Sequence, residues 1–213
     1  MPRLTRAESQ AHTRDRLIAT ATELFLRDGY SGTSLGKVAQ AAGYSKGAVY
    51  SNFRSKDELC LAVLDRIRAE RDATMAESLS TAEGPEDLLR AFSAWWERVT
   101  SDETWMMLEI EYLTHARRDP KLRHQMAVRN AEVRRSITQL LTSCLDRCGL
   151  GLPVPPEVVG IALYGMSIGL GLLRSVDGDL DLGALPAVLQ TLVTAGGPDA
   201  TPPPEDGPET PAP

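Results

Sequence analysis

The chain has 213 residues, of which 42% are hydrophobic, so it is long and apolar enough to bury a core. Its 23 basic and 29 acidic side chains give a net charge of −6, which excludes a uniformly basic nucleic-acid coat protein. Residues 1–55 hold 8 basic and 4 acidic side chains, and residues 56–213 hold 15 and 25. A basic N-terminal part on an acidic remainder predicts that the N-terminal part alone binds a polyanion.

The periodicity is helical throughout, without alternating β-branched runs, and predicts an all-α fold. Leu17, Ala21, Leu24 and Phe25 share one face of a first helix, which ends at Asp28-Gly29. Glycine, proline and capping residues bound the remaining helices, which we expect at residues 33–42, 45–53, 55–78, 84–99, 101–113, 119–148, 155–174 and 182–195.

The last residues, 197–213, differ in composition from the rest of the chain. They contain seven prolines, four acids and no Lys or Arg, so we expect a disordered tail that buries too little apolar surface to offset its ordering entropy. Such an acidic tail is either simply solvated or competes with a polyanion for the basic N-terminal part.

The three cysteines do not form a disulfide framework. Cys144 and Cys148 share a helix face, and buried thiols in a reducing cytoplasm are the simpler interpretation. A redox sensor activated by Arg147 is the alternative. The sequence shows no secretory signal, and its longest charge-free stretch, residues 158–173, is shorter than the about 20 residues that a membrane span needs. We therefore expect a cytoplasmic protein without a membrane span.

Two short helices around residue 43 form a candidate helix-turn-helix, because Gly43 permits a sharp turn and Ser45 can cap the second helix. The second helix begins with small, polar or basic residues. These let it lie deep in a major groove and bring Lys46 to base edges or phosphates. Val49 and Phe53 are four residues apart and are expected to pack inward.

Further groups near this motif favour a nucleic-acid backbone. Thr33 and Ser34 lie at the start of the preceding helix, where free backbone N–H groups attract phosphate. Arg14 and Lys56 add positive charge nearby. A plain three-helix packing unit without DNA binding is the alternative for the helices alone.

The motif resembles the signature of the tetracycline-repressor (TetR) family over residues 12–65, and the matching residues are Thr33, Val38, Ala39, Ala42-Gly43-Tyr44-Ser45, Gly47, Tyr50, Phe53, Ser55-Lys56 and Glu58-Leu59. The resemblance implies a three-helix DNA-binding domain, a larger helical ligand-binding and dimerisation domain, and a homodimer on double-stranded DNA with a palindromic operator. It implies DNA contacts at Thr33, Ser45, Lys46, Gly47, Tyr50 and Lys56. The domains then cover residues 1–55, ordered from about residue 10, and residues 56–196, followed by the tail.

Two positions depart from the family pattern. Asn52 stands where the family often has His or Tyr, and it can still bind a phosphate or a base. Tyr44 replaces a small aliphatic residue, and is either a DNA contact or only a turn residue.

The larger domain concentrates aromatic residues between positions 92 and 112, and methionines add adaptable apolar surface. A cavity for a small-molecule effector is one interpretation, and an ordinary helical core is the other. The candidate lining residues are Phe92, Trp95, Trp96, Trp105, Met106, Glu109, Tyr112 and Met166. Glu109 and Glu111 are compatible with a cationic ligand, and His115 offers a further polar contact.

Metal and catalytic interpretations are weaker. Glu111 and His115 lie one helical turn apart and His124 follows, but these side chains are scattered and no thiol lies near them. The sequence contains no phosphate-binding glycine loop, zinc-protease motif or nucleophile elbow. We expect no metal, no cofactor and no enzymatic activity.

Gly160, Gly165 and Gly169 permit close helix approach. By resemblance, residues 157–174 and 182–195 form the dimer interface, and close packing within one subunit is the alternative. The resulting hypothesis is a ligand-responsive repressor released by a small apolar or amphipathic effector, with the helix over residues 55–78 as the lever. The alternatives are an activator or co-repressor-type regulator of the same fold, or a small-molecule sensor or carrier without DNA binding.

Overall fold

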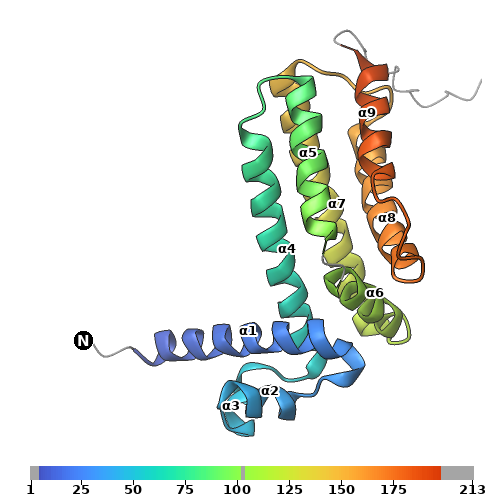
Figure 1. Cartoon of the computed structure of the whole chain (residues 1–213). Helices are drawn as coiled ribbons and strands as arrows, with labels where there is room; N and C mark the ends of the chain where they lie inside the picture. The colour runs from blue at the N-terminus through green and yellow to red at the C-terminus, as the bar shows by residue number, and fades with distance from the viewer. Residues whose placement is uncertain (1–4, 102–103, 198–213) are drawn as a thin grey trace, which may run out of the picture.

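The computed structural model describes residues 5–101 and 104–197, and these residues form nine α-helices (Figure 1). In chain order they are α1 (Arg6–Gly32), α2 (Leu35–Ala42), α3 (Lys46–Asn52), α4 (Lys56–Ser80), α5 (Pro85–Thr100), α6 (Thr104–Ala116), α7 (Pro120–Cys148), α8 (Pro156–Arg174) and α9 (Ala184–Gly196). The predicted all-α class is confirmed. The predicted tail lies outside the described residues, apart from Gly197.

Helix boundaries follow the local capping signals. Ser34, Ser45 and Ser55 precede α2, α3 and α4, and each side chain accepts a hydrogen bond from the backbone N–H three residues further on. Gly43 ends α2 in the left-handed region at φ 72°, which glycine adopts without steric cost. Thr5 forms a capping box at the start of α1, so this helix begins before the expected ordered start near residue 10.

The helices form two parts (Figure 1). The head, α1–α3, lies at one end of the molecule, and α1 runs across it. The body consists of α4–α9. Helix α4 extends from the head beside α5 and α7, whereas α8 and α9 lie on the side of the body away from α4. Helix α6 lies at the base of the body and packs against α1. This arrangement brings two elements of the body, α4 and α6, into direct contact with the head.

Two hydrophobic clusters correspond broadly to these parts. The head cluster combines buried residues of α1–α3 with the first turns of α4, and it also includes Leu108, Tyr112 and Ala116 from α6. The body cluster lies among α5, α7, α8 and α9. Because α6 contributes to the head cluster, the head contacts the body through α6 as well as through its covalent connection to α4.

Among the described helices, α8 is long and apolar enough to span a membrane by length and composition. It also packs in the body, where Val159 and Leu163 are buried against neighbouring helices. Gly160 permits the close approach to α7, since an added Cβ would lie 2.5 Å from Oγ1 of Thr138. Gly160 therefore permits close packing of two helices within one subunit, which was the alternative to a dimer interface for this residue. Gly165 and Gly169, by contrast, have open space around the Cβ position.

Candidate DNA-binding surface and ligand cavity

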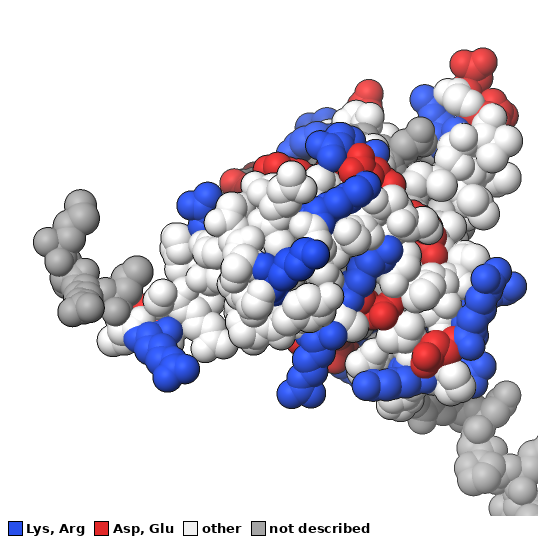
Figure 2. Space-filling model, turned by 90° about the horizontal axis from the view of Figure 1, so that it is seen from below, with Lys and Arg blue, Asp and Glu red and all other residues white. Residues whose placement is uncertain are grey.

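The start of α3 lies on the outer surface of the head. Ser45, Lys46 and Gly47 are exposed there, and the side chain of Tyr50 is 59% exposed one turn further along. Val49 and Phe53 are fully buried beneath them, as their spacing predicts. Figure 2 views the molecule from the head end, where Lys and Arg side chains are spread over the surface. The head therefore presents a short helix with a small, polar and basic N-terminal turn on a predominantly basic face.

Arg14 holds α3 in place instead of standing free on this face. Its Nη1 donates to the backbone oxygen of Asn52 at 2.7 Å, and its guanidinium lies 4.2 Å from the centre of the Phe53 ring. The contact caps the last carbonyl groups of α3 and ties that helix to α1. Asn52 turns its amide back into α3, where Nδ2 donates to the oxygen of Ala48 at 2.8 Å. Both side chains are engaged within the head.

The side chain of Thr33 is engaged within the head. Thr33 is only 2% exposed, and its hydroxyl contacts the backbone oxygens of Gly29 at 3.0 Å and Leu24 at 3.2 Å. The side chain closes the turn between α1 and α2, and the DNA contact expected from the start of this helix stays a prediction. The neighbouring Ser34 is exposed and caps α2. Tyr44 is half-buried and packs against the head cluster, which favours its interpretation as a turn residue.

A polar network joins the head to the body. Oη of Tyr30 donates to Oδ1 of Asp57 at 2.7 Å, and Nε2 of His115 lies 3.0 Å from the same carboxylate oxygen. The carboxylate of Glu111 accepts the backbone N–H groups of Tyr30 at 2.7 Å and Ser31 at 2.9 Å. We call these five residues the junction. They fix the end of α1 to the start of α4 and to α6.

Lys56 packs at this junction, with Nζ 4.0 Å from the centre of the Tyr30 ring. The expected DNA contact at Lys56 therefore competes with a cation–π contact inside the protein. Glu111 and His115, the candidate metal ligands, contact Tyr30 and Ser31 of the head. In the part of the chain that the structure describes, no group of three His, Cys, Asp or Glu side chains is placed to hold a metal ion.

The electrostatics of Glu111 follow from these contacts. Burial by itself raises the pKa of its carboxyl group, but the hydrogen bonds from Ser31 and Tyr30 favour the charged form and lower the pKa below its usual value. Glu111 is thus held as a carboxylate. Its charge stabilises the turn at the end of α1.

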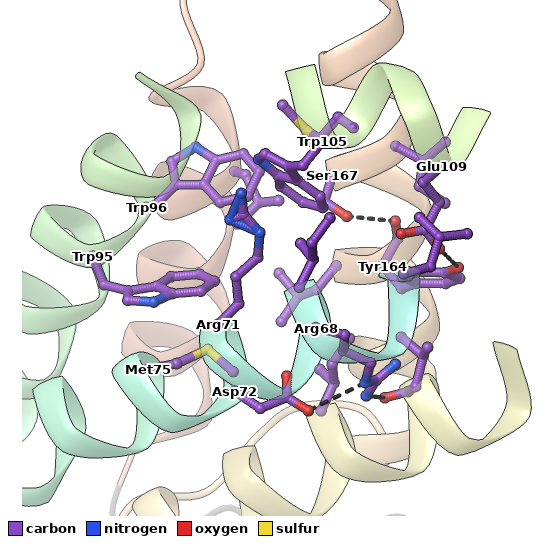
Figure 3. A pocket seen from close by; sticks show the side chains of 18 of the residues that line it. Arg68, Arg71, Asp72, Met75, Trp95, Trp96, Trp105, Glu109, Tyr164 and Ser167 are labelled. Atoms are coloured by element: carbon purple, nitrogen blue, oxygen red, sulfur yellow. Dashed lines mark hydrogen bonds and ion pairs between the residues drawn. The ribbon is translucent and has the colours of Figure 1, made fainter. Parts of the chain in front are cut away.

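The body contains a cavity of about 140 Å³ that is lined by α4, α5, α6, α7 and α8 and by Leu185 of α9 (Figure 3). Six of the eight residues predicted to line a cavity do so, namely Phe92, Trp95, Trp96, Trp105, Met106 and Glu109. The aromatic residues cluster in the sequence because α5 and α6 follow each other in the chain and each directs one face toward the cavity.

Tyr112 and Met166 do not line this cavity, which corrects their predicted placement. Tyr112 is fully buried in the head cluster, where its ring meets the Tyr30 ring edge-on at 5.3 Å between centres. It lies on the face of α6 that turns toward α1. Met166 of α8 is partly buried and packs against the body cluster.

The cavity wall also has a polar part, which was not predicted from the sequence. Arg68 and Arg71 reach it from α4, Arg129 from α7, and Tyr164 from α8. A signal for Arg71 and Arg129 was present: each occupies one step of an otherwise apolar helical stripe, Leu64–Ile67–Arg71–Met75 in α4 and Met126–Arg129–Val133 in α7. A charged residue at such a step is buried or lines a cavity.

Charged groups in the wall are paired. Nη1 of Arg129 lies 2.8 Å from Oε1 of Glu109, and its Nε lies 2.9 Å from Oδ1 of Asp65. Arg129 is 7% exposed and Glu109 9% exposed, so this is a buried ion pair. The carboxylates of Glu109 and Glu111, whose sequence positions are compatible with a cationic ligand, therefore do not face one space as a pair. One is neutralised by Arg129, and the other serves the junction.

The cysteines are divided between the two clusters. Cys60 lies in the head cluster and Cys144 in the body cluster, and both are buried, while Cys148 is half-buried. Burial raises the pKa of the Cys144 thiol, although Nη2 of Arg147 lies 3.5 Å from its sulfur. Arg147 mainly caps α4, donating to the oxygen of Leu79 at 2.7 Å. These contacts favour the buried-thiol interpretation over a redox sensor.

An exposed helix-turn-helix on a helical body defines the class of protein: a helix-turn-helix transcriptional regulator. Residues 17–63 match the family model described as "Bacterial regulatory proteins, tetR family", and residues 85–196 match "BetI-type transcriptional repressor, C-terminal". The chain belongs to the TetR family of transcriptional regulators and carries a BetI-type C-terminal domain. The family resemblance of the sequence motif is thereby confirmed, and the family is not one of enzymes.

Individual relatives agree with this assignment. The transcriptional repressor AcnR of Corynebacterium efficiens is 25% identical over 73% of this chain and 78% of its own length. The transcriptional regulator AcrR of Shigella flexneri is 44% identical over 59 residues, which are 28% of this chain and 27% of AcrR. A crystal structure of a TetR-family regulator from Rhodococcus sp. superposes with a TM-score of 0.71 over 86% of this chain and 99% of that one, at 17% identity, and supports the fold alone.

Proposed function

We propose that this regulator is a repressor that binds a palindromic operator as a homodimer and is released when a small apolar or amphipathic effector fills the body cavity. The observation that carries the proposal is the shared use of α6. Trp105, Met106 and Glu109 of α6 line the cavity, while Glu111 and His115 of the same helix contact Ser31 and Tyr30 of the head. A ligand in the cavity and the head therefore both contact the same helix, α6.

DNA contacts are proposed for the exposed residues of the head. Lys46 is placed to reach bases or phosphates from the first turn of α3, and the hydroxyl of Tyr50 to reach a phosphate. Ser34 and Ser45 are exposed and cap the N-termini of α2 and α3, where backbone N–H groups can bind phosphate. Gly47 lets the backbone approach the groove closely. Because operator DNA lies in the bacterial cytoplasm, we place the protein there.

The homodimer is proposed to form through α8 and α9. Val158, Ile161 and Leu172 are exposed large hydrophobic residues of α8, and their spacing places them along one side of the helix together with Gly165 and Gly169. On α9, Val188 is also exposed. Such an apolar stripe on two adjacent helices fits a second copy of the same face. Two heads spaced about 34–36 Å apart would then read successive major grooves.

The regulatory mechanism is a linkage between two binding events. The dimer has one conformation whose heads fit the operator and another whose heads do not. An effector that binds the second conformation more tightly shifts the dimer toward it and so weakens operator binding. A coupling of about 1–3 kcal/mol weakens DNA binding about 5- to 150-fold. Both α4 and α6 join the cavity wall to the junction, so both transmit the change.

The proposal is tested by selecting bound sequences from a random duplex pool with the full chain. We expect one palindrome to be enriched, and the enrichment to be lost in Lys46→Ala and Tyr50→Ala. Arg66→Ala, which removes an exposed charge from α4, is the matched control and is expected to select the same palindrome. If the wild-type protein enriches no sequence even at low salt, the DNA-binding proposal is wrong.

A further inference from the structure

The three tryptophans of the cavity wall use their indole N–H groups within the protein. Nε1 of Trp95 donates to Oγ1 of Thr74 at 3.2 Å, Nε1 of Trp96 to the oxygen of Leu182 at 2.7 Å, and Nε1 of Trp105 to the oxygen of Val99 at 3.1 Å. The indoles therefore offer their carbon faces and edges to a ligand. An aromatic ring packs well on such surfaces, either offset and stacked or edge to face.

The acidic side chains of the described cavity wall are paired with arginines. Glu109 lies 2.8 Å from Nη1 of Arg129, and Asp72 lies 3.2 Å from Nε of Arg68. Asp65, which is not among the lining residues, gives Arg129 a second carboxylate at 2.9 Å. A cationic ligand would therefore gain a carboxylate only by breaking one of these ion pairs.

The arginines of the described wall are engaged as well. Arg129 holds two carboxylates, and Arg68 contacts the backbone oxygen of Val133 at 3.4 Å in addition to Asp72. The guanidinium of Arg71 lies 3.8 Å from the centre of the Trp105 ring, and this stacking is not its only interaction. An anionic ligand would have to displace existing interactions to gain an arginine.

The hydroxyl groups of the wall are also hydrogen-bonded within the protein. Oη of Tyr164 lies 3.1 Å from Oδ1 of Asn130 and 3.3 Å from Oε1 of Glu109, and Oγ of Ser167 donates to the oxygen of Tyr164 at 2.8 Å. Figure 3 shows Tyr164 and Ser167 on the side of the cavity where Glu109 lies. A ligand charge that entered this cavity would lose its water without gaining a partner that is not already in use.

The size of the cavity limits the ring system. About 140 Å³ is close to the roughly 150 Å³ of an engineered cavity that binds benzene. One aromatic ring with a short substituent therefore fits without large rearrangement, whereas a fused multi-ring compound does not.

We propose that the cavity binds an uncharged compound with one aromatic ring, and that the Glu109–Arg129 pair excludes charged compounds of the same shape. This inference rests on the proposed function, because it names the chemical class of the effector for the same cavity. The tryptophan faces supply affinity for the ring. The ion pair determines specificity, because each of its charges already occupies the other.

Three probes of nearly equal size test the exclusion of charge: benzyl alcohol, benzoate and benzylamine, the last two being charged at pH 7.5. Binding to the full-length protein is measured by calorimetry and by the change in tryptophan fluorescence. Benzyl alcohol is expected to bind at least about tenfold more tightly than either charged probe, since burying an uncompensated charge is costly. Binding of benzoate or benzylamine as tight as that of benzyl alcohol, or no binding of benzyl alcohol at millimolar concentration, would overturn the proposal.

Two further uncharged probes test the ring. Cyclohexylmethanol replaces the aromatic ring by a saturated one, and 2-naphthalenemethanol adds a second fused ring. Both are more apolar than benzyl alcohol, so a nonspecific apolar surface would bind them more tightly. We expect neither to bind more tightly than benzyl alcohol. Tighter binding of the saturated alcohol would contradict recognition of an aromatic ring, and tighter binding of the naphthalene compound would contradict the limit of one ring.

Variants of the ion pair are expected to change the specificity in opposite directions. Glu109→Gln releases Nη1 of Arg129 and should strengthen benzoate binding at least about tenfold, whereas Arg129→Gln releases Glu109 and should strengthen benzylamine binding by a similar factor. Glu70→Gln changes an exposed carboxylate of α4 that is paired with Arg66, and as the matched control it should bind all probes like the wild type.

Folded variants that still reject the charged probes as the wild type does would contradict the role of the Glu109–Arg129 pair. If both variants fail to fold, Asp72→Asn provides the same test at a more exposed pair, because it releases Arg68. That variant should then gain benzoate binding, and unchanged rejection of benzoate would contradict the exclusion of charge by ion pairing.

The outcomes separate this inference from the proposed function. If the protein selects a palindrome but does not prefer the uncharged single-ring probe, the repressor proposal stands and the assignment of the effector class is wrong. If benzyl alcohol binds with the expected preference but no DNA sequence is selected, the cavity assignment stands and the repressor proposal is wrong.

Discussion

The head and the body bury polar groups in different ways. In the head, the hydroxyl of the buried Thr33 contacts backbone oxygens of Leu24 and Gly29 in the same part of the molecule. The body buries Glu109 and Arg129, two charged side chains that neutralise each other beside a cavity. A neutral hydroxyl held in this way helps to keep a surface fixed, although the buried hydroxyl of Tyr112 in the head cluster has no hydrogen-bond partner among the described residues. A buried ion pair beside an opening can respond to what enters it, because each charge is costly once its partner is disturbed.

The same comparison shows that the two parts are not independent. Leu108, Tyr112 and Ala116 of α6 complete the head cluster, and Trp105, Met106 and Glu109 of the same helix line the cavity. One helix thus has a face in each part. A boundary at residue 55 separates the chain by sequence but not by packing.

The largest effect is expected from removing one charge of the buried pair. Glu109→Ala leaves Arg129 buried with Asp65, which is largely exposed, as its remaining partner. We expect the free energy of unfolding to fall by about 3–5 kcal/mol, measured by urea denaturation. Glu70→Ala breaks the exposed pair with Arg66 and should cost less than about 1 kcal/mol.

The double variant Glu109→Leu/Arg129→Met removes both charges of this pair and should recover most of the stability lost in Glu109→Ala. If Glu109→Ala is as mild as Glu70→Ala, the buried pair does not distinguish the body from the head.

The next effect concerns the proposed dimer face of the body. Ile161→Asp places a charge on the exposed stripe of α8 and is expected to yield monomers in sedimentation experiments. Operator affinity should fall at least about 100-fold, because the second head no longer binds from the same complex. Val176→Asp changes an even more exposed valine beyond the end of α8 and is the control. Dimers of Ile161→Asp with full affinity would place the interface elsewhere.

A smaller effect is expected for Arg14 in the head. Arg14→Ala removes the contacts with Asn52 and Phe53, and we expect a loss of about 1–3 kcal/mol in unfolding free energy. Operator binding should weaken while its salt dependence stays unchanged, since a positioning residue does not neutralise a phosphate. Arg16→Ala removes the same charge from an exposed site on α1. A stable Arg14→Ala protein with a reduced salt slope would instead identify Arg14 as a phosphate contact.

The smallest effect is expected at the junction and depends on pH. The pKa of Glu111 is lowered in the folded protein from about 4.5, so its stabilising contribution is present above that pH and is lost as the pH falls through the folded value. Between pH 5 and 3, we expect the urea midpoint of the wild type to fall more steeply than that of Glu111→Gln. Glu23→Gln, at an exposed site on α1, should follow the wild type. Identical slopes for Glu111→Gln and the wild type would show that the carboxylate does not stabilise the junction.

The helix boundaries could be predicted from the sequence because they depend on capping and turn residues that act locally. Ser45 and Ser55 cap helices through neighbours three residues away, and Gly43 has the positive φ that its turn requires. These preferences act over a few residues, so the sequence contains them directly. The inward packing of Val49 and Phe53 follows from helical spacing in the same way.

Contacts between distant residues are what the sequence could not show at the site. Lys56 is engaged by the Tyr30 ring, 26 positions earlier, and Arg14 by the end of a helix 38 positions later, while their DNA contacts stay predictions. The concentration of aromatic residues between positions 92 and 112 predicts that Tyr112 lines the cavity, yet it lies on the face of α6 that meets the head. Which side of an amphipathic helix faces which neighbour is decided by tertiary packing, and one sequence alone does not reveal it.

The most direct test compares the affinity of the protein for the selected palindrome and for a duplex carrying a single half-site, together with the number of protomers bound to each. We predict two protomers on the palindrome and at least about 100-fold weaker binding to the half-site. Equal affinity for both duplexes with one protomer bound, or binding that does not depend on sequence, would contradict a dimeric operator-binding repressor.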